Sequence, residues 1–150
     1  MDYKHDQLYI DIAHVVAGQS HDEEIKVGSI IVREGQILSQ GWNGMPSGME
    51  NVMRHSTGAT KKEVIHSEAN ALMKLAKNGG GSNAATIYCT HSPCWECAKL
   101  ILQAGINRIV YSHCYDEQSV LFLKERGLEI ECIQPSSRIP PGEDQEDKHK

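Results

Sequence analysis

Helical and strand-like patterns of apolar residues follow one another along this chain of 150 residues. Apolar residues at helical spacing, bounded by capping residues and glycines, predict helices over residues 7–18, 66–77, 93–104 and 119–126. Apolar runs and alternating positions between turn residues predict strands over residues 26–32, 36–42, 85–90, 108–112 and 128–133. The first two strands surround a turn at Gly35, so they should form a hairpin.

Particular residues set the expected helix faces and boundaries. In the first helix, the stripe that should face the core consists of Leu8, Ile12 and Val15 or Val16. Gly18 is expected to end this helix. In the third helix, Ser92 is the expected N-cap and Pro93 the first helical residue, because serine caps well and proline tolerates that position.

The order of the elements predicts an α/β fold. A helix, a hairpin and then alternating helices and strands should give a mixed five-stranded sheet with helices on both faces, joined by right-handed crossovers. The length suits one domain, which we assign to residues 1–134. From Pro135 onward the chain turns to proline, serine and then charged residues, so residues 135–150 are expected to form a disordered tail.

Composition and charge narrow the function classes. A net charge of −5, a pI near 5.9 and the lack of an evident basic face favour a small substrate over a nucleic acid. We expect no membrane span and no signal peptide, because long apolar runs are missing. Five cysteines suit a reducing cytoplasm better than a disulfide framework. Three cysteines in or beside strands are expected to be small buried side chains: Cys89, Cys114 and Cys132.

The most informative motif is His66-Ser67-Glu68, followed later by Pro93-Cys94-Trp95-Glu96-Cys97. One imidazole and two thiols suit Zn²⁺, and three protein ligands leave the fourth position for water, as in catalytic zinc sites. Two thiolates cancel the charge of the metal, so water bound there is acidified less than at a three-histidine site and needs a nearby base. Glu68 is expected to be this base rather than a ligand.

Simpler explanations of the cysteine pair account for less of the motif. Cys94 and Cys97 could be a redox pair or half of a zinc ribbon. The chain has no second Cys-x-x-Cys for a ribbon, and a redox pair explains neither His66 nor Glu68. Both halves of the motif lie at expected helix starts, whose N–H groups and positive partial charges favour thiolates. The two helix starts should therefore converge on one metal ion.

The chain resembles the cytidine deaminase superfamily and, within it, the deoxycytidylate (dCMP) deaminases. The stretches that carry this resemblance are residues 27–32, 41–48, 65–71, 92–99, 103–106 and 111–116. The pattern H-x-E…P-C-x-x-C is shared across zinc-dependent nucleobase deaminases, whereas the Asn-Gly-x-Pro-x-Gly turn and the Cys-Ala-Lys…Gln-Ala-Gly-Ile stretch favour the narrower group. The resemblance covers residues 8–133 and implies a three-layer α-β-α cytidine-deaminase-like fold.

The resemblance implies zinc-dependent hydrolysis of dCMP to dUMP with release of ammonia, which supplies dUMP for dTMP synthesis. It implies that Glu68 shuttles protons and that one Zn²⁺ ion is bound by His66, Cys94 and Cys97. The substrate contacts that it implies come from Asn43, Ser67, Ser92 and Tyr115. By charge alone, the candidate phosphate ligands are Lys26 and Arg108. Asn43 could instead be a left-handed turn residue, and Tyr115 an ordinary half-buried aromatic.

The resemblance also implies a cytoplasmic homo-oligomer, hexameric in many relatives, with dCTP and dTTP as effectors and Mg²⁺ accompanying them. The chain lacks the cysteines that longer members carry near the first strand and the glycine turn, so a second, structural zinc is not expected. Two other functions stay open. One is a related zinc deaminase acting on free cytidine or deoxycytidine or on an RNA adenine, and the other is a non-catalytic zinc-stabilised binding module, in which Glu68 would have no task.

Overall fold

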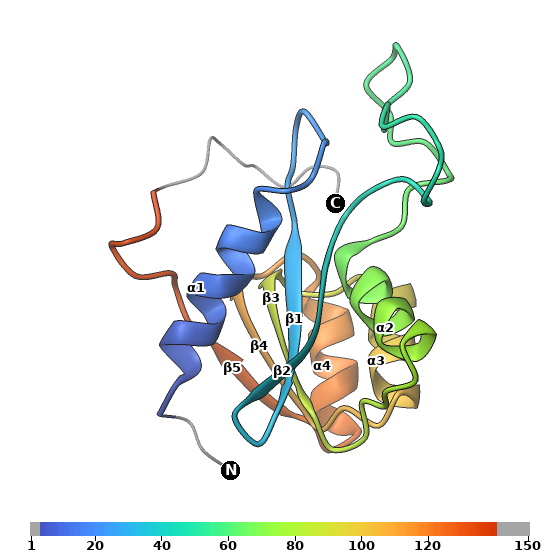
Figure 1. Ribbon diagram of the computed structural model, residues 1–150. Helices are drawn as coiled ribbons and strands as arrows, with labels where there is room; N and C mark the ends of the chain where they lie inside the picture. Colours follow the sequence, from blue (N-terminus) through green and yellow to red (C-terminus); the bar gives the residue numbers. More distant parts are fainter. Residues whose placement is uncertain (1–3, 141–150) are drawn as a thin grey trace.

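A five-stranded mixed sheet forms the middle layer of the protein (Figure 1). The structure is a computed structural model, and it describes residues 4–140. The strands are β1 Gly28–Arg33, β2 Gln36–Trp42, β3 Thr86–His91, β4 Arg108–His113 and β5 Glu129–Cys132. The helices are α1 Asp6–Ala17, α2 Ser67–Lys77, α3 Trp95–Gln103 and α4 Glu117–Glu125. The predicted order of elements is confirmed.

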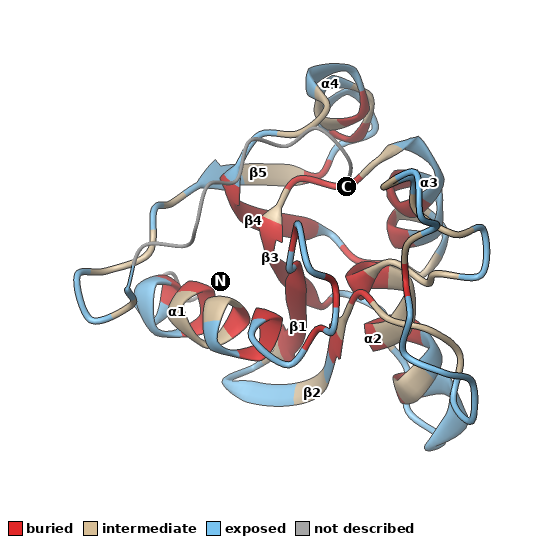
Figure 2. Ribbon diagram, turned by 90° about the horizontal axis from the view of Figure 1, so that it is seen from above, coloured by how far each residue is buried: buried red, intermediate tan, exposed pale blue. Residues whose placement is uncertain are grey.

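The sheet has the strand order β2-β1-β3-β4-β5. β1 pairs antiparallel with both β2 and β3, while β3, β4 and β5 run parallel to one another. Helix α1 covers one face, and α2, α3 and α4 cover the other (Figure 2). The expected mixed sheet between helical layers is therefore confirmed. Because parallel strands end at the same edge, the segments that follow β3 and β4 lie side by side.

Side chains that alternate along the central strands divide the core into two layers. Ile31 and Ile87 pack on the side of α2, α3 and α4, whereas Ile30 and Tyr88 pack against α1. This alternation follows from the two-residue period of a strand. Each face of the sheet is thus covered by its own apolar cluster. A polar side chain that is buried in either cluster needs a hydrogen-bond partner there.

The apolar stripe predicted for α1 was partly right. Val16 is buried and Ile12 is partly buried against the same cluster, but Leu8 and Val15 are 50% and 63% exposed. The buried face consists of Asp6, Tyr9, Ile10, Ala13, Val16 and Ala17. The reason is a close approach at β1, where a Cβ atom on Gly28 would overlap the backbone of Ala13 and Ala17. The glycine lets these two alanines rest on the sheet, and that contact turns Leu8 and Val15 outward.

Two predicted helix starts also need correction. Helix α3 begins at Trp95 with Cys94 as its N-cap, so Ser92 is not the cap and Pro93 is not the first helical residue. The Ser92 hydroxyl instead accepts the backbone N–H groups of Tyr115 (2.6 Å) and Asp116 (3.3 Å), in the loop after β4. Helix α4 begins two residues earlier than predicted, because the Asp116 carboxylate caps it by accepting backbone N–H groups of its first turn.

The cysteines outside the zinc motif differ in exposure. Cys89 is buried as predicted, but Cys114 and Cys132 are exposed, so the prediction was wrong for those two. Past β5 the chain lies against α1, where Ser136 donates hydrogen bonds from its N–H and its hydroxyl to the Asp11 carboxylate. Within residues 4–140, helices long and apolar enough to cross a lipid bilayer are absent. The domain boundary and the disordered tail stay predictions, and residues 141–150 lie outside the described part.

Candidate active site

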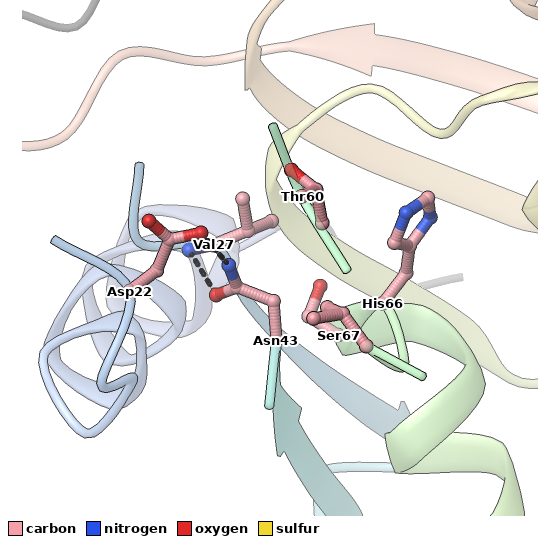
Figure 3. A pocket seen from close by; sticks show the side chains of 7 residues that line it. Asp22, Val27, Asn43, Thr60, His66 and Ser67 are labelled. Carbon is pink, nitrogen blue, oxygen red and sulfur yellow. Dashed lines mark hydrogen bonds between the residues drawn. The ribbon is translucent and has the colours of Figure 1, made fainter. Parts of the chain in front are cut away.

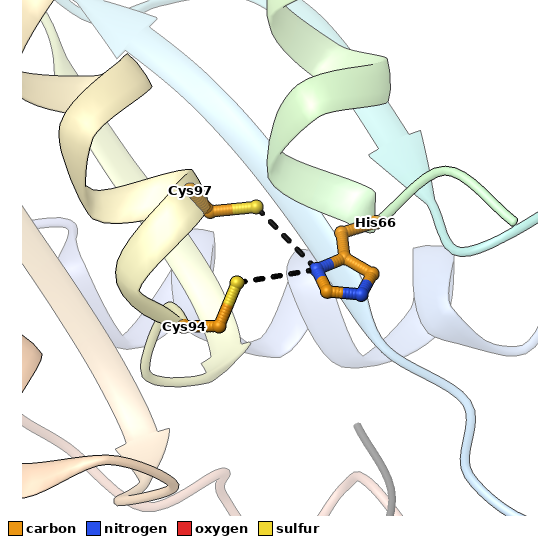
Figure 4. A group of neighbouring side chains, drawn as sticks. All are labelled: His66, Cys94 and Cys97. Atoms are coloured by element: carbon orange, nitrogen blue, oxygen red, sulfur yellow. Dashed lines mark hydrogen bonds between the residues drawn. The ribbon is translucent and has the colours of Figure 1, made fainter. Parts of the chain in front are cut away.

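Three potential metal ligands converge where the N-terminal ends of α2 and α3 meet (Figure 4). His66 is the N-cap residue of α2, Cys94 is the N-cap residue of α3, and Cys97 lies in the first turn of α3. His66 Nδ1 is 3.4 Å from the sulfur of Cys94 and 3.5 Å from that of Cys97. Within residues 4–140, these three side chains are the His, Cys, Asp or Glu residues that lie close enough together to hold a metal ion.

The spacing of these atoms fits zinc. Zn–S bonds of about 2.3 Å and Zn–N bonds of about 2.0 Å at tetrahedral angles separate nitrogen from sulfur by about 3.5 Å. The two measured N···S separations agree with that value. A hydrogen bond with Cys97 and, against the effect of burial, another with His66 lower the pKa of the Cys94 thiol to about 4. Cys94 is therefore prepared to bind a cation as a thiolate, next to two helix N-termini.

Glu68 lies two residues past His66, in the first turn of α2, and is completely buried. Its Oε1 accepts a hydrogen bond of 3.0 Å from the hydroxyl of Ser67. A buried carboxylate is costly without partners that hydrogen-bond to it. Glu68 therefore lies in the same helical turn as the potential ligand His66, and its role in proton transfer stays a prediction.

A pocket with an empty volume of about 250 Å³ opens beside these residues (Figure 3). Its lining residues come from the segment before β1, the end of β2, the connection between β2 and α2, and the start of α2: Asp22, Val27, Asn43, Thr60, Val64, His66 and Ser67. The pocket brings two predicted site residues, Asn43 and Ser67, next to the potential ligand His66. The pocket, which is partly open to solvent, therefore lies directly beside the potential metal ligand His66.

Asn43 forms one wall of the pocket and is fixed there by hydrogen bonds from both ends of its amide. Its Oδ1 accepts the N–H of Val27 at 2.9 Å, and its Nδ2 donates to the carbonyl oxygen of Ile25 at 3.0 Å. Nδ2 also lies 3.5 Å from a carboxylate oxygen of Asp22. The φ angle of Asn43 is not positive, so Asn43 is not the left-handed turn residue that was the alternative prediction.

Ser92 and Tyr115 lie on the neighbouring loops that follow β3 and β4. Ser92 is fully buried, and its N–H donates to the carbonyl oxygen of His113 at 2.8 Å. With its hydroxyl holding the N–H of Tyr115, Ser92 ties the Cys94 loop to the Tyr115 loop. This structural task was not predicted from the sequence. Contacts of Ser92 and Tyr115 with a substrate stay predictions.

Arg108 is not available as a phosphate ligand, which corrects the expectation based on its charge. Its side chain is 1% exposed, and its two terminal nitrogens donate to both carboxylate oxygens of Asp6 at 2.8 and 2.6 Å. It begins β4, whereas the metal cluster lies beyond the other end of the parallel strands. Lys26 is exposed next to the pocket residue Val27 and remains a candidate.

The contacts that hold the long connection between β2 and α2 (residues 43–66) were not predicted from the sequence. Arg54 reaches from this connection to Asp22, donating to both carboxylate oxygens at 2.8 and 3.0 Å. Its Nη1 donates to the carbonyl oxygen of Gly58 at 2.9 Å. Asp22, Thr60 and Val64 line the pocket but carry no local motif. Opposite charges 32 positions apart are too common to predict such a pair.

Comparison with known proteins places this site among zinc-binding deaminases. Residues 3–113 match the model of the cytidine and deoxycytidylate deaminase zinc-binding region. The deoxycytidylate deaminase of Saccharomyces cerevisiae is 33% identical over 136 residues, covering 83% of this chain and 43% of that protein. The deoxycytidylate deaminase of Enterobacteria phage T2 is 30% identical over 166 aligned positions, covering 81% of this chain and 88% of that protein.

A solved structure extends the similarity to three dimensions. The crystal structure of dCMP deaminase from the cyanophage S-TIM5, in complex with dCMP and dUMP, superposes with a TM-score of 0.84 at 36% sequence identity. The match covers 89% of this chain and 99% of that chain. The chain therefore spans less than half of the yeast protein but nearly the whole of the phage enzymes.

Proposed function

Because the chain belongs to the cytidine and deoxycytidylate deaminase family, we propose that it hydrolyses dCMP to dUMP and releases ammonia. The observation that carries the proposal is the open His66–Cys94–Cys97 cluster, with Glu68 and a small pocket beside it. The similarity to a dCMP deaminase that binds dCMP and dUMP, covering 99% of that chain, supports this substrate over a free nucleoside. The same reaction would supply dUMP for dTMP synthesis.

His66, Cys94 and Cys97 are proposed to hold one Zn²⁺ ion. When bound, zinc polarises a water molecule and lowers the pKa of that water. Three protein ligands leave a coordination position for the water, as catalytic zinc sites require. The donor set of one imidazole and two thiols, at spacings that fit tetrahedral zinc, supports this assignment.

Glu68 is proposed to move the protons of the reaction. It takes one proton from the attacking water and delivers it to a ring nitrogen of the pyrimidine. It then moves the remaining hydroxyl proton to the departing amino group, which leaves as ammonia. A carbon–oxygen bond forms where the carbon–nitrogen bond breaks. The complete burial of Glu68 in the same helical turn as His66 supports this role, since it keeps bulk water away from the carboxylate.

The pocket is proposed to hold the nucleotide through groups on several loops. Asn43, fixed at the pocket wall, would hydrogen-bond the sugar, and the N–H of Ser67 would face the pyrimidine ring. Tyr115 would border the nucleotide from the loop after β4. Lys26 is the remaining candidate for the phosphate, because it is an exposed cation next to Val27.

A substrate panel tests the proposal. Purified protein containing zinc is incubated with dCMP, CMP, deoxycytidine, cytidine and an adenine-containing RNA hairpin, and ammonia release is measured. We expect dCMP to have the highest kcat/KM, with deoxycytidine at least 100-fold lower because it lacks the phosphate. Faster turnover of deoxycytidine, or salt-sensitive turnover of the RNA, would reject dCMP as the substrate in favour of a nucleoside or RNA deaminase.

Regulation and assembly are proposed from family resemblance alone. We expect a cytoplasmic homo-oligomer, a hexamer in the simplest case, that acts on a small nucleotide and not on nucleic acid. dCTP would activate it and dTTP would inhibit it, each accompanied by Mg²⁺. Turnover of dCMP with and without each effector, together with the mass measured by light scattering, tests these expectations separately from the reaction itself.

A further inference from the structure

Two serines and a cysteine interrupt the apolar core under the start of α2. Ser29 on β1, Ser67 on α2 and Cys89 on β3 all have 0% exposure. Ser29 and Cys89 are direct partners across the antiparallel β1–β3 pair, and both face α2. Burying a hydroxyl costs free energy unless it finds a hydrogen-bond partner, so an apolar residue would be the simpler solution at these positions.

The two hydroxyls form a chain that ends at Glu68. Ser67 Oγ donates to Glu68 Oε1 at 3.0 Å, and Ser29 Oγ lies 2.7 Å from Ser67 Oγ. The hydroxyl of Ser67 donates its one proton to Glu68, so Ser29 is the donor and Ser67 the acceptor in the 2.7 Å contact. At the far end of this chain, Cys89 Sγ is a second and weaker acceptor for the Ser29 hydroxyl, at 3.4 Å. Hydrogen bonds aligned in this way strengthen one another, most of all toward a charged acceptor.

The backbone brings the helix close enough for this chain to form. Gly41 on β2 is the other cross-strand neighbour of Ser29. A Cβ atom on Gly41 would overlap the carbonyl oxygen of Ser67 and the N–H of Ala71. The missing side chain lets α2 rest directly on the sheet, so that the hydroxyl of Ser67 reaches the hydroxyl of Ser29. Sheet and helix together fix the direction of the Ser67 hydroxyl.

From this geometry we infer that Ser67 and Ser29 are positioning residues for Glu68. The inference rests on the proposed function, in which Glu68 moves protons between water and the pyrimidine. A general base must lie within about 2.6–3.2 Å of the atoms with which it exchanges protons. The hydrogen bonds that run from Ser29 through Ser67 hold one carboxylate oxygen of Glu68 in place. The carboxylate therefore keeps one orientation from one proton transfer to the next.

The test compares Ser67→Ala and Ser29→Ala with Ser39→Ala. Ser39 is a matched control, because its hydroxyl also crosses from the sheet to α2, donating to the carbonyl oxygen of Ala71 at 2.7 Å, but it is not part of the chain to Glu68. For each zinc-loaded protein, kcat and KM for dCMP, the zinc content and the rate of zinc loss to a chelator are measured.

We expect Ser67→Ala to lower kcat about tenfold, the scale of a hydrogen bond to a charged group, with KM within about twofold. Ser29→Ala should lower kcat about threefold, and adding it to Ser67→Ala should lower kcat no further, since both act through one chain. Zinc content and zinc loss should match the parent in all variants, and Ser39→Ala should leave kcat unchanged.

An unchanged kcat in Ser67→Ala, or losses of kcat that multiply in the double variant, would overturn the inference. Ser29→Ala leaves Ser67 in place, so it carries the test should Ser67→Ala fail to fold.

A crystal structure of zinc-loaded Ser67→Ala separates this inference from the proposed function. We expect the Glu68 carboxylate in more than one orientation in the variant and in one orientation in the parent. That result would stand even for a parent protein that does not deaminate dCMP, in which case only the proposed substrate would be rejected. A single, unchanged orientation of Glu68 in Ser67→Ala would overturn the positioning role whatever the substrate.

Discussion

Glu68 combines two properties that a proton shuttle needs. It is completely buried, and it is adjacent to the metal cluster through the first turn of α2. Glu68→Gln keeps the shape of the side chain but removes its ability to take a proton. We expect this variant to bind zinc like the parent and to lose kcat by about 10²–10⁴-fold, because general acid–base catalysis contributes a factor of that size. Elemental analysis and ammonia release measure the two quantities on the same sample.

Variants of two other residues show whether a loss of activity comes from lost metal or from lost proton transfer. Cys94→Ala should lose zinc together with activity, and its thermal midpoint should fall, because zinc binding contributes to folding. Cys132→Ala removes an exposed thiol on β5 and should retain zinc and turnover. A Glu68→Gln protein that turns over dCMP at nearly the parent rate would contradict the shuttle, and a zinc-loaded Cys94→Ala protein would contradict the ligand set.

Residues with a task inside one short motif were predictable, and residues with distant partners were not. The convergence of His66, Cys94 and Cys97 was predictable because chemistry and spacing coincide within a few positions of a helix start. Arg108 was misassigned because its partner Asp6 is 102 positions away. A lone arginine in a sequence does not reveal whether its charge faces a ligand or a buried carboxylate.

At the scale of elements, a buried ion pair helps to hold the connection between β2 and α2 near the pocket. Figure 1 shows this segment, residues 43–66, projecting from the body of the protein. Arg54 and Asp22 fasten it, with side chains only 10% and 3% exposed. Thr60 and Val64 on the same segment line the pocket. The ion pair therefore links the stability of the segment to the shape of the substrate site.

We expect Arg54→Met to lower the free energy of unfolding by about 3 kcal/mol, because it leaves the buried carboxylate of Asp22 without its charged partner. KM for dCMP should rise several-fold while kcat changes less, since the loosened segment supplies pocket walls rather than proton transfer. Urea titration and steady-state kinetics measure both effects. The paired change Asp22→Asn with Arg54→Met should unfold less easily than Arg54→Met alone.

The control for this ion pair lies in the same segment. Lys62 is exposed, so Lys62→Met should change the free energy of unfolding by less than about 0.5 kcal/mol and leave KM unchanged. Equal effects of Arg54→Met and Lys62→Met would mean that the Arg54–Asp22 contact does not hold the segment.

Element order was predictable because each helix and strand carries its own periodic pattern, whereas helix rotation and helix starts depend on neighbours. Residues 7–18 offer two apolar stripes at helical spacing, and the contact with Gly28 on β1 selects the one that contains Ala13 and Ala17. The start of α3 moved to Trp95 because the Ser92 hydroxyl binds the loop after β4 instead of capping the helix. Both errors arise where tertiary contacts override a local preference.

At the scale of the whole molecule, Asp6 and Arg108 join the first helix to the centre of the sheet. Besides Arg108, Asp6 accepts a hydrogen bond of 2.6 Å from the hydroxyl of Tyr88. Burial alone would raise the pKa of Asp6, but hydrogen bonds from Arg108 and Tyr88 outweigh burial and hold that pKa below its ordinary value of 3.8. Burial and the hydrogen bond to Asp6 raise the pKa of Tyr88, and the opposing effect of Arg108 is smaller. The pair lies at the end of the sheet away from the metal cluster, so its loss should act on stability rather than on chemistry.

The direction of the Asp6 pKa shift fixes how this contribution depends on pH. A carboxyl group whose pKa is lower in the folded than in the unfolded protein stabilises fully above the unfolded value, and its contribution is lost as pH falls through the folded value. At pH 7 we expect Asp6→Asn to cost about 3 kcal/mol, since buried Arg108 loses its bidentate partner and keeps Glu129, 3.3 Å from its Nε, as an ion-pair partner. Below about pH 4 the difference in free energy of unfolding between the parent and Asp6→Asn, measured in urea, should shrink, because the parent now loses the charge that the variant lacks.

Replacing both partners, with Asp6→Leu and Arg108→Met, should restore much of the stability and remove this pH dependence. A gap between parent and Asp6→Asn that stays constant from pH 7 to pH 3 would show that Asp6 does not titrate as the ion pair requires.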